Sequence, residues 1–550
     1  MSRLTRTAVT AASTLAVVAL LAGCSASPSP SASDQGGEPV SGGTLTYLEP
    51  QTWTTLYPPS AGFYPNGGIV NNITDRLLYQ NPETLELEPW IATDYTVNDD
   101  ATEYTFDLRT DVTYSDGTAL TAANVVKNID LYGKGDKDRA LPISEAINNY
   151  DRGEVVDDDT VVFRFTAPSP GFAQAVSTIN SGLLSDATLD RTSEQFGPGN
   201  AAEIIGSGPF VISAEQIGTQ TSVTKRDDYD WAPASASHQG PAYLDGIDYI
   251  LAGEDSVRIG TVVAGQADIA RNIPAPDEAQ FAAGGLSLHA AATNGVNNGL
   301  SFRFREPRLE DVRVRKAIIA GIDRQKIVDT LFTQNYPLAT GALAKTALGY
   351  VDTSSSYVYD PDEAAALLDE AGWTRGSDGI REKEGEKLTL TFNEALPQPR
   401  SREVVTLIQE QLGELGIQVS LFAGDQAAQT KASTDQSTIQ VYHSMVGRAD
   451  FDVLKSQYFS KNRNTLLNLN PADGTVGDTE LDSLLQAIAS KPTTPERQAA
   501  SEAAQAYLAE NALILPLFEE PQVFGLTSRV RGFETESVGR PSFFSTWLAS

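Results

Sequence analysis

The chain has a single cysteine, Cys24, among its 550 residues, and this limits how it can be stabilised. One thiol cannot form an intramolecular disulfide or supply a cysteine metal cluster. The length and the 41% hydrophobic content allow about two or three separate domains. The folded protein must therefore be held together by the packing of its hydrophobic cores.

The residues before Cys24 are typical of an export signal. Arg3 and Arg6 form a short basic start, and the apolar run at 8–21 has about 14 residues, fewer than the roughly 20 that cross a bilayer. Residues 21–24 (LAGC) then resemble the lipobox of bacterial lipoproteins. The resemblance implies that a signal peptide, residues 1–23, is removed and that Cys24 is lipidated. An ordinary secretory signal with an incidental cysteine is the alternative.

The segment after the cysteine and the overall charge indicate how the protein meets a membrane. Residues 24–41 are rich in Ser, Pro and Gly, which predicts a disordered tether. A formal net charge of −32 argues against nucleic-acid binding and against lying flat on anionic lipid. Two acyl chains on Cys24 would anchor the protein stably. We therefore expect a monomer that is lipid-anchored to the outer face of the cytoplasmic membrane.

From residue 42 onward, strand patterns alternate with capped helices. Asp360, followed by Pro361, predicts a helix that ends at Gly372, and Thr493 or Thr494 opens another toward residue 511. Further patterns predict a helix from 401 to 416 and strands at 44–48, 104–109, 160–165, 417–421, 440–445 and 513–518. This mixture predicts an α/β architecture. No internal repeat or later linker interrupts it, so we expect interleaved domains.

Several segments resemble the peptide/nickel-type extracellular solute-binding proteins of bacterial ABC transporters, known as family 5. They are residues 42–45, 104–109 with 115–118, 206–210, 311–317 with 322–324, and 359–361 through 371–373. Each segment is weak alone, but their order and spacing extend over nearly the whole mature chain.

The resemblance implies a clamshell like that of periplasmic binding proteins, with an extra inserted lobe and mixed sheets flanked by helices. Lobe I would comprise residues 42–75, 205–292 and 520–550, lobe II residues 76–204, and lobe III residues 293–519. It also implies that hinged lobes close on a small-molecule or peptide ligand and that the closed form docks on an ABC permease with its ATPase.

The segment 447–452 is the strongest candidate for ligand contact. It follows a predicted strand, and open α/β sheets bind ligands beyond strand ends. In peptide-binding relatives an aspartate of this loop pairs with the ligand's α-amino group, and Asp450 matches it. Where the family commonly has an aromatic residue, this chain has Gly447 and Arg448. Because a guanidinium can bind a carboxylate through two hydrogen bonds, Arg448 and Asp450 predict a zwitterion or a solute with several carboxylates. The alternative is that Arg448 and Asp450 lie on a solvated loop and only pair with neighbouring residues.

Other candidates come from matching positions. Phe63 and Tyr64 lie in an early loop where relatives contact ligand, and Gly299 and Ser301 lie on the strand that enters lobe III. Lower candidates are Trp53 and His443. We expect Arg313, Arg315 and Arg324 to pair with surface carboxylates, and Asp116 to form a turn.

No enzyme signature is present in the sequence. It has no Gly-x-Ser-x-Gly elbow, no His-Glu-x-x-His motif and no Cys/His cluster, so we predict no catalytic residue, no metal and no cofactor. The predicted function is a binding protein that delivers a peptide or similar polar, zwitterionic solute to an importer. The alternatives are an extracellular hydrolase with a carboxylate pair and a lipoprotein of this fold that reports ligand to a sensor. Peptides, metal chelates, amino-acid conjugates and oligosaccharides all remain open as ligands.

Overall fold

The computed structural model of the protein describes residues 37–549 apart from 284, 397, 399, 434–436, 464–466 and 471–472. The predicted signal peptide, the lipidation of Cys24 and most of the predicted tether lie outside the described residues. Residues 37–43 take no regular secondary structure. In the described part of the chain, no helix combines the length and apolar character that a membrane span requires.

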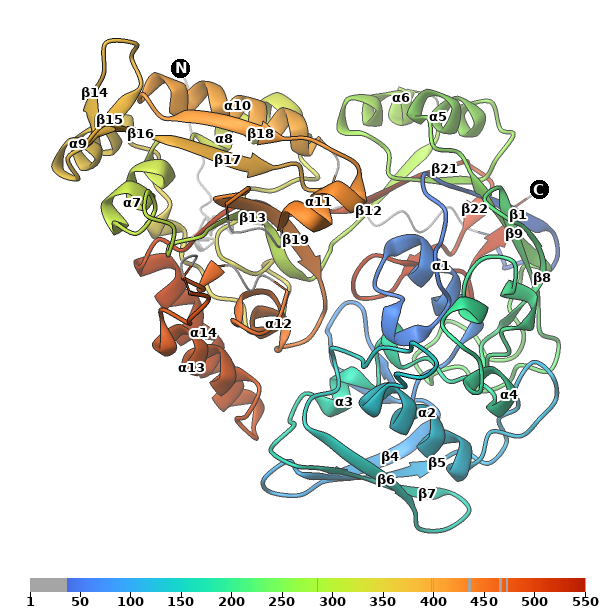
Figure 1. The fold of residues 1–550 in the computed structure, drawn as a ribbon. Coiled ribbons are helices and arrows are strands. Elements are labelled where there is room, and N and C mark those ends of the chain that lie inside the picture. Colours follow the sequence, from blue (N-terminus) through green and yellow to red (C-terminus); the bar gives the residue numbers. More distant parts are fainter. Residues whose placement is uncertain are drawn as a thin grey trace, which may run out of the picture.

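A seven-stranded mixed sheet forms one side of the molecule (Figure 1). Its central strand β1 (Thr44–Glu49) pairs in parallel with β10 (Gly246–Leu251) and β11 (Ile269–Arg271). The remaining strands are β8 (Phe210–Gln216), β9 (Gln220–Lys225), β12 (Ser287–Ala291) and β21 (Gln522–Leu526). The associated helices are α1 (Tyr64–Ile73), α5 (Asp255–Val263) and α6 (Glu278–Ala283). Strands from both ends of the chain thus share one sheet.

A four-stranded antiparallel sheet lies at the bottom of Figure 1, with α2 (Ala122–Lys134) against it. Its strands are β4 (Ala92–Val97), β5 (Glu103–Leu108), β7 (Thr160–Phe165) and β6 (Tyr150–Val155), in that order. The short helices α3 (Phe172–Ala175) and α4 (Asp186–Leu189) follow.

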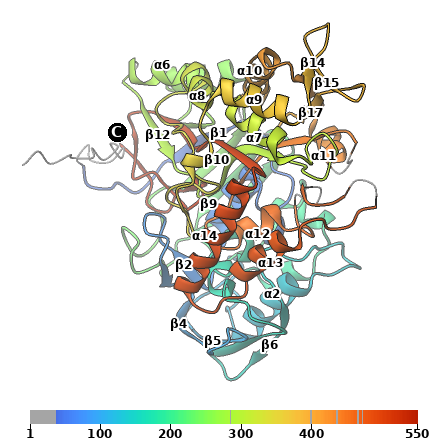
Figure 2. The same ribbon diagram turned by 90° about the vertical axis from the view of Figure 1, so that its left-hand side faces the viewer.

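A five-stranded mixed sheet lies in the remaining part. Its order is β18 (Gln418–Phe422), β17 (Thr389–Asn393), β19 (Val441–Gly447), β13 (Gly295–Phe302) and β20 (Ile514–Phe518). The helices of this part are α7 (Val312–Ala320), α8 (Arg324–Leu331), α9 (Pro361–Glu370), α10 (Ser401–Glu414), α11 (Gln426–Ser433), α12 (Val453–Tyr458), α13 (Thr479–Ile488) and α14 (Thr494–Glu510). Helices α13 and α14 lie side by side (Figure 2).

Short strand pairs complete the structure. They are β2 (Leu78–Gln80) with β3 (Leu87–Pro89), β15 (Arg381–Lys383) with β14 (Thr374–Arg375) and β16 (Glu386–Lys387), β22 (Val530–Arg531) with β25 (Trp547–Leu548), and β23 (Glu534–Thr535) with β24 (Pro541–Ser542). The predicted α/β class with mixed sheets is confirmed.

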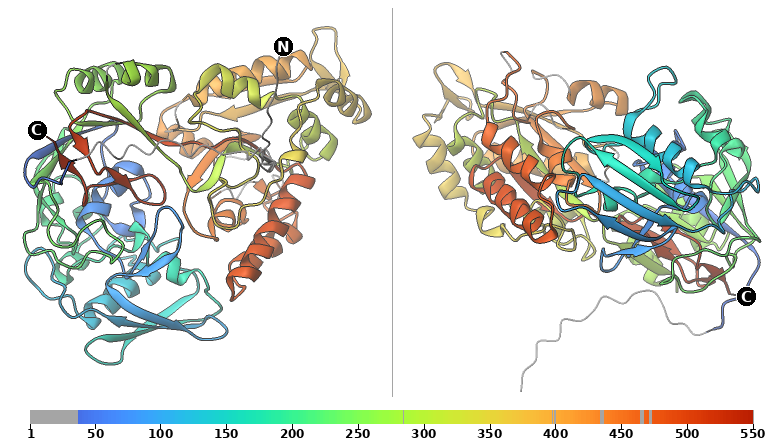
Figure 3. Two further views of the ribbon diagram at one scale, coloured as in Figure 1. Left: turned by 180° about the vertical axis from the view of Figure 1, so that it is seen from behind. Right: turned by 90° about the horizontal axis from the view of Figure 1, so that it is seen from below.

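Two short crossings join the seven-stranded and five-stranded sheets. Residues 292–294 connect β12 to β13, and residues 519–521 connect β20 to β21. The C-terminal crossing appears in red from behind in Figure 3. Each of the three larger sheets takes its strands from within one of the predicted lobes, so we use the names lobe I, II and III below. The lobe borders themselves stay a prediction.

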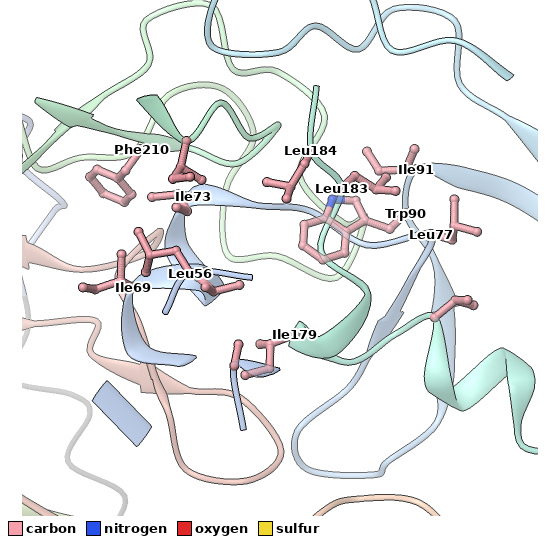
Figure 4. Close-up of a cluster of buried hydrophobic side chains, with 14 of the residues drawn as sticks. Leu56, Ile69, Ile73, Leu77, Trp90, Ile91, Ile179, Leu183, Leu184 and Phe210 are labelled. Carbon is pink, nitrogen blue, oxygen red and sulfur yellow. The ribbon is translucent and has the colours of Figure 1, made fainter. Parts of the chain in front are cut away.

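The hydrophobic cores differ in how they join the lobes. One core cluster is continuous between lobes I and II: Figure 4 shows Ile69, Ile73 and Phe210 of lobe I among Leu77, Trp90 and Leu184 of lobe II. A second cluster lies mainly in lobe III and extends well into lobe I, where its members include Leu48, Val262, Phe281 and Val523, and a third belongs to lobe III alone. Lobe I therefore shares one apolar core with lobe II and another with lobe III.

The arginines of α7 and α8 require a correction. Arg313 pairs with Asp311 as expected, but Arg315 and Arg324 are buried. Arg315 donates to the carbonyls of residues 309, 310, 511 and 512, and Arg324 to those of 339, 357 and 516. A guanidinium with five donors can satisfy several loop carbonyls at once, and this use cannot be recognised from the local sequence.

Candidate ligand-binding site

A cavity of about 510 Å³ lies where the three lobes meet. Its wall includes Phe63 and Tyr64 of lobe I, residues 142–146 and 177–180 of lobe II, and residues 445–449 of lobe III. The volume falls within the roughly 300–1,000 Å³ that is usual for small-molecule sites. The cavity therefore has the size and position of a ligand site between lobes.

Arg448 and Asp450 form a two-pronged ion pair beside this cavity. The Arg448 Nε and Nη2 atoms each lie 2.9 Å from a carboxylate oxygen of Asp450, and the two side chains are 14% and 6% exposed. Burial opposes charge on Arg448, but the Asp450 carboxylate outweighs it and raises the pKa of the guanidinium. Arg448 lines the cavity, whereas Asp450 lies behind it. The third nitrogen, Nη1, is buried and has no partner among the described residues.

The position of Arg448 follows from the end of β19. Gly447 ends the strand and pairs with Gly295, the first residue of β13. Gly295 has φ +134°, and a side chain there would lie 2.1 Å from the carbonyl oxygen of Val446, so this close approach requires glycine. The Arg448 amide donates to the carbonyl of Asn294 (2.9 Å), and the Asn294 side chain donates to the Ser537 carbonyl of lobe I. The loop is thus bonded directly to a crossing between lobes.

Arg540 lies at the lobe I side of the same cavity. Its Nη2 donates to the Gly62 carbonyl (2.6 Å), and its Nη1 lies 3.3 Å from Glu536. The guanidinium stacks 4.9 Å from the ring centre of Tyr64, whose hydroxyl donates to the Val538 carbonyl (2.7 Å). Arg540 Nε is buried without a partner in the described structure. Tyr64 therefore holds the arginine in place as well as lining the wall.

Arg76, at the start of lobe II, is a third arginine on the wall. Its Nη2 donates to the Asn71 side chain (2.9 Å) and its Nη1 to the Thr74 carbonyl (3.1 Å). The guanidinium lies 4.8 Å over the Trp90 ring. Its Nε is also buried and has no partner among the residues described. Burial lowers the pKa of Arg76.

Arginines gather on the wall of this cavity, although the protein as a whole is strongly acidic. Four arginines, Arg76, Arg448, Arg463 and Arg540, line the cavity together with two glutamates, Glu145 and Glu536. The net charge of the whole chain is −32. Three of these arginines are paired with a carboxylate: Arg448 with Asp450, Arg463 with Glu145 and Arg540 with Glu536. What they can offer a ligand is therefore the N–H donors that these pairs leave, and not a large uncompensated charge.

Lobes II and III are joined across the cavity by polar contacts. Glu145 of lobe II pairs with Arg463 of lobe III at 2.6 Å, and both side chains are about half exposed. Gln80 donates to the Ala449 carbonyl (2.8 Å). Asn148 donates to Asp452 (3.3 Å). Of these contacts, the Glu145–Arg463 pair can break at low cost, since exposed ion pairs contribute only about 0–1 kcal/mol.

A smaller cavity of about 40 Å³ adjoins the large one. The two share Phe63, Tyr64, Gln398 and Met445. The smaller cavity is also lined by Glu520, which lies in the crossing between β20 and β21. Burial raises the pKa of Glu520 to about 7, and a hydrogen bond from Asn298 opposes that shift.

The remaining predicted residues lie elsewhere. Gly299 and Ser301 are inside the five-stranded sheet, between β19 and β20, and neither is among the residues lining the large cavity. Trp53 is buried in lobe I and donates to Thr221. His443 is buried in β19. Sequence reasoning missed Arg76, Arg540, Arg463 and Glu520, which have no local motif and are brought together only by the fold.

Within the described part of the chain, no group of three or more His, Cys, Asp or Glu side chains is placed to hold a metal ion. The arrangement is that of a cavity where three lobes meet, lined by arginines and aromatic rings.

Comparisons with known proteins agree with this class. Residues 86–464 match the family described as bacterial extracellular solute-binding proteins, family 5. The match extends over more than half of the chain, so the protein belongs to this family. Among curated relatives, the glutathione-binding protein GsiB of Escherichia coli O157:H7 is 23% identical over 490 residues, which cover 88% of this chain and 90% of the relative. GsiB of Salmonella typhi is 24% identical with the same coverage.

Solved structures show the same fold. NikA from Brucella suis in complex with Fe(III)-EDTA has a TM-score of 0.76 at 22% identity, with 92% of this chain and 100% of that chain covered. The oligopeptide-binding protein AppA of Bacillus subtilis, in complex with a nonapeptide, has a TM-score of 0.75 at 19% identity and covers 93% and 100%. The predicted clamshell fold and family are thereby confirmed.

Proposed function

We propose that this protein is the lipid-anchored, extracellular binding component of an ABC importer and that it captures a small solute with several carboxylates. A peptide or another zwitterion of that kind is the expected ligand. Closure of lobe III on lobes I and II buries the solute, and the closed form delivers it to a permease and its ATPase without altering a covalent bond. Family membership supports the transport role, and the residues around Cys24 support the anchor.

The observation that carries the ligand class is the set of unpartnered guanidinium nitrogens. Arg76 Nε, Arg448 Nη1 and Arg540 Nε are all buried at one cavity, and the described residues supply none of them with an acceptor. A buried donor without a partner costs about 1–3 kcal/mol, and more when it is charged. The three atoms are closed to solvent in this structure, so the proposal requires that movement of the lobes around a ligand brings carboxylate oxygens to them, which would recover that cost.

In this proposal Arg448 contacts the ligand and Asp450 positions Arg448. The two hydrogen bonds to Asp450 fix the plane of the guanidinium and leave Nη1 without a partner among the described residues. Phe63 and Tyr64 supply the apolar wall. The names of the relatives are consistent with this chemistry, because glutathione and EDTA both carry several carboxylates.

Isothermal titration calorimetry on the mature protein tests the proposal. The test ligands are glutathione, the tripeptide Glu-Ala-Glu, the uncharged trisaccharide maltotriose and Ni²⁺ with histidine. We expect 1:1 binding of the solutes that carry two or more carboxylates, recovery of the unchanged solute by mass spectrometry, and loss of binding in Arg448→Gln. Preference for maltotriose would contradict the ligand class, and turnover of a bound solute would favour the hydrolase alternative.

A further inference from the structure

Glu520 is a buried carboxylate that does not line the large, arginine-lined cavity. It is 6% exposed and lines the smaller cavity, whose volume is about 40 Å³. One water needs roughly 10–15 Å³, so this space holds a single polar head group but not a whole solute. Because Phe63, Tyr64, Gln398 and Met445 line both cavities, a group in the small one lies next to the solute in the large one.

A chain of buried hydrogen bonds fixes one oxygen of Glu520 from behind. The Asn298 amide donates to Oε2 (2.8 Å), and its Oδ1 lies 2.7 Å from His443 Nε2. His443 Nδ1 lies 3.0 Å from the Ser401 hydroxyl. Since burial lowers the pKa of His443 to about 4, the ring is neutral at physiological pH. It can then donate from Nε2 and accept at Nδ1, so the chain runs in one direction and ends on Glu520.

The charged groups around Glu520 leave its carboxylate without a counter-ion. None of the described residues forms an ion pair or hydrogen bond with its Oε1 atom. Arg271 lines the same cavity, but it is bound to Glu49 (2.5 Å) and donates to Gln522 (2.9 Å). Among the described residues, Tyr336 is the other group whose pKa Glu520 affects: burial, and then the Glu520 carboxylate, raises the pKa of Tyr336, so its phenol is neutral. A buried carboxylate without a counter-ion is unfavourable, so a cationic group on a ligand would stabilise its charged form.

We propose that Glu520, held by Asn298, binds the ammonium or guanidinium group of the captured solute in this small cavity. The proposal rests on the proposed function and adds a second charge to the ligand. Carboxylates lie on the arginine side, and a cationic group lies on the far side of Phe63 and Tyr64. In this proposal the ammonium group binds Glu520 and not Asp450, because both carboxylate oxygens of Asp450 already accept hydrogen bonds from Arg448 and from the Asp452 amide.

The test compares two ligands that differ by one ammonium group. The first is the tripeptide Glu-Ala-Glu, and the second is glutaryl-Ala-Glu, which lacks only the α-amino group. We expect wild-type protein to prefer the first by about 30-fold or more, the factor typical of a lost partner in a desolvated charge pair. The preference should fall to near unity in Glu520→Gln, whose amide oxygen still accepts from Asn298.

The matched control is Glu519→Gln, the same change one residue earlier. Glu519 lines neither cavity and accepts from the Lys345 amide, so the preference should persist in this variant. A preference that survives in Glu520→Gln, or that disappears in Asp450→Asn instead, would overturn the proposal.

A second measurement tests the subsite without relying on the tripeptide. In protein labelled with ¹³C at the glutamate carboxyl carbons, the signal missing in Glu520→Gln reports the protonation of Glu520. We expect n-butylammonium to lower the pKa of this group, and n-butanol and Na⁺ at equal ionic strength to leave it unchanged. An equal response to all three would overturn the subsite. If wild-type protein bound neither tripeptide, the proposed ligand class would fail and this titration alone would decide the role of Glu520.

Discussion

The pair Arg448–Asp450 allows a direct test of whether the loop after β19 serves ligand binding or only its own stability. The perturbations are Arg448→Gln, Asp450→Asn and the double variant. Both single changes leave one charge buried without its partner, because the side chains are 14% and 6% exposed and joined by two 2.9 Å hydrogen bonds.

The structure sets the expected magnitudes. Breaking a buried ion pair by removing one partner costs about 3–5 kcal/mol, whereas replacing both partners, as measured with hydrophobic residues of similar volume, leaves no uncompensated charge and is often nearly neutral. Because Arg448 borders a cavity that water can enter, we expect about 2–3 kcal/mol for Asp450→Asn. We expect the double variant to return to within about 1 kcal/mol of wild type. Arg448→Gln should weaken binding of Glu-Ala-Glu by about 30-fold or more.

Urea unfolding and calorimetry on the same four proteins separate the two roles. Stability should recover in the double variant while affinity stays low, since the guanidinium that reaches the ligand is gone. If the double variant bound the tripeptide as tightly as wild type, Arg448 and Asp450 would be a purely structural pair and our site assignment would be wrong.

Four further outcomes follow from the same structure. Burial raises the pKa of Glu520 to about 7, so the ligand-free protein should lose about 3 kcal/mol of stability as pH rises from 4.5 to 7, and Glu520→Gln should abolish this loss in urea unfolding at different pH values. Burial lowers the pKa of His443 to about 4, so about 3 kcal/mol should be lost as pH falls from 6.5 to 4, and His443→Gln should flatten that limb. Glu145→Gln removes a half-exposed pair with Arg463 and should change affinity less than about 5-fold, with the effect vanishing in high salt. Asp116→Ala removes the carboxylate that accepts a hydrogen bond from the Thr118 amide in a turn (2.9 Å). It should lower stability by about 0.5–1.5 kcal/mol and leave the affinity for Glu-Ala-Glu unchanged.

The elements that were predictable from sequence are those specified by neighbouring residues. The Asp360 cap of α9 is present as predicted, and α14 begins after Thr493, one of the two expected starts, where the structure adds a capping box with Glu496. Such caps are predictable because they depend on residues within one turn. The loop at Arg448 follows a strand end as expected. In each case the determining contacts lie within a few positions of each other.

The parts that could not be predicted depend on contacts between distant segments. Arg76 and Arg540 are more than 400 positions apart and meet at one cavity. Glu520 acquires its properties from Asn298 and His443, which lie on other strands. In so acidic a protein Arg315 and Arg324 are expected to pair with surface carboxylates, but the fold surrounds them with backbone carbonyls instead. Composition and periodicity do not show which residues from distant segments of the chain meet in the fold.

The central claim is that lobe III closes on the rest of the molecule around a solute. The single cysteine of the chain, Cys24, can be replaced, so two introduced cysteines can be labelled without interference. Dyes at Asp99 in lobe II and Ser483 on α13 in lobe III, both on the exposed surface, report the distance between these lobes by single-molecule fluorescence energy transfer. We predict that Glu-Ala-Glu shifts the population from longer to shorter distances in wild type but not in Arg448→Gln. A tripeptide that binds without any change in that distance would contradict the account.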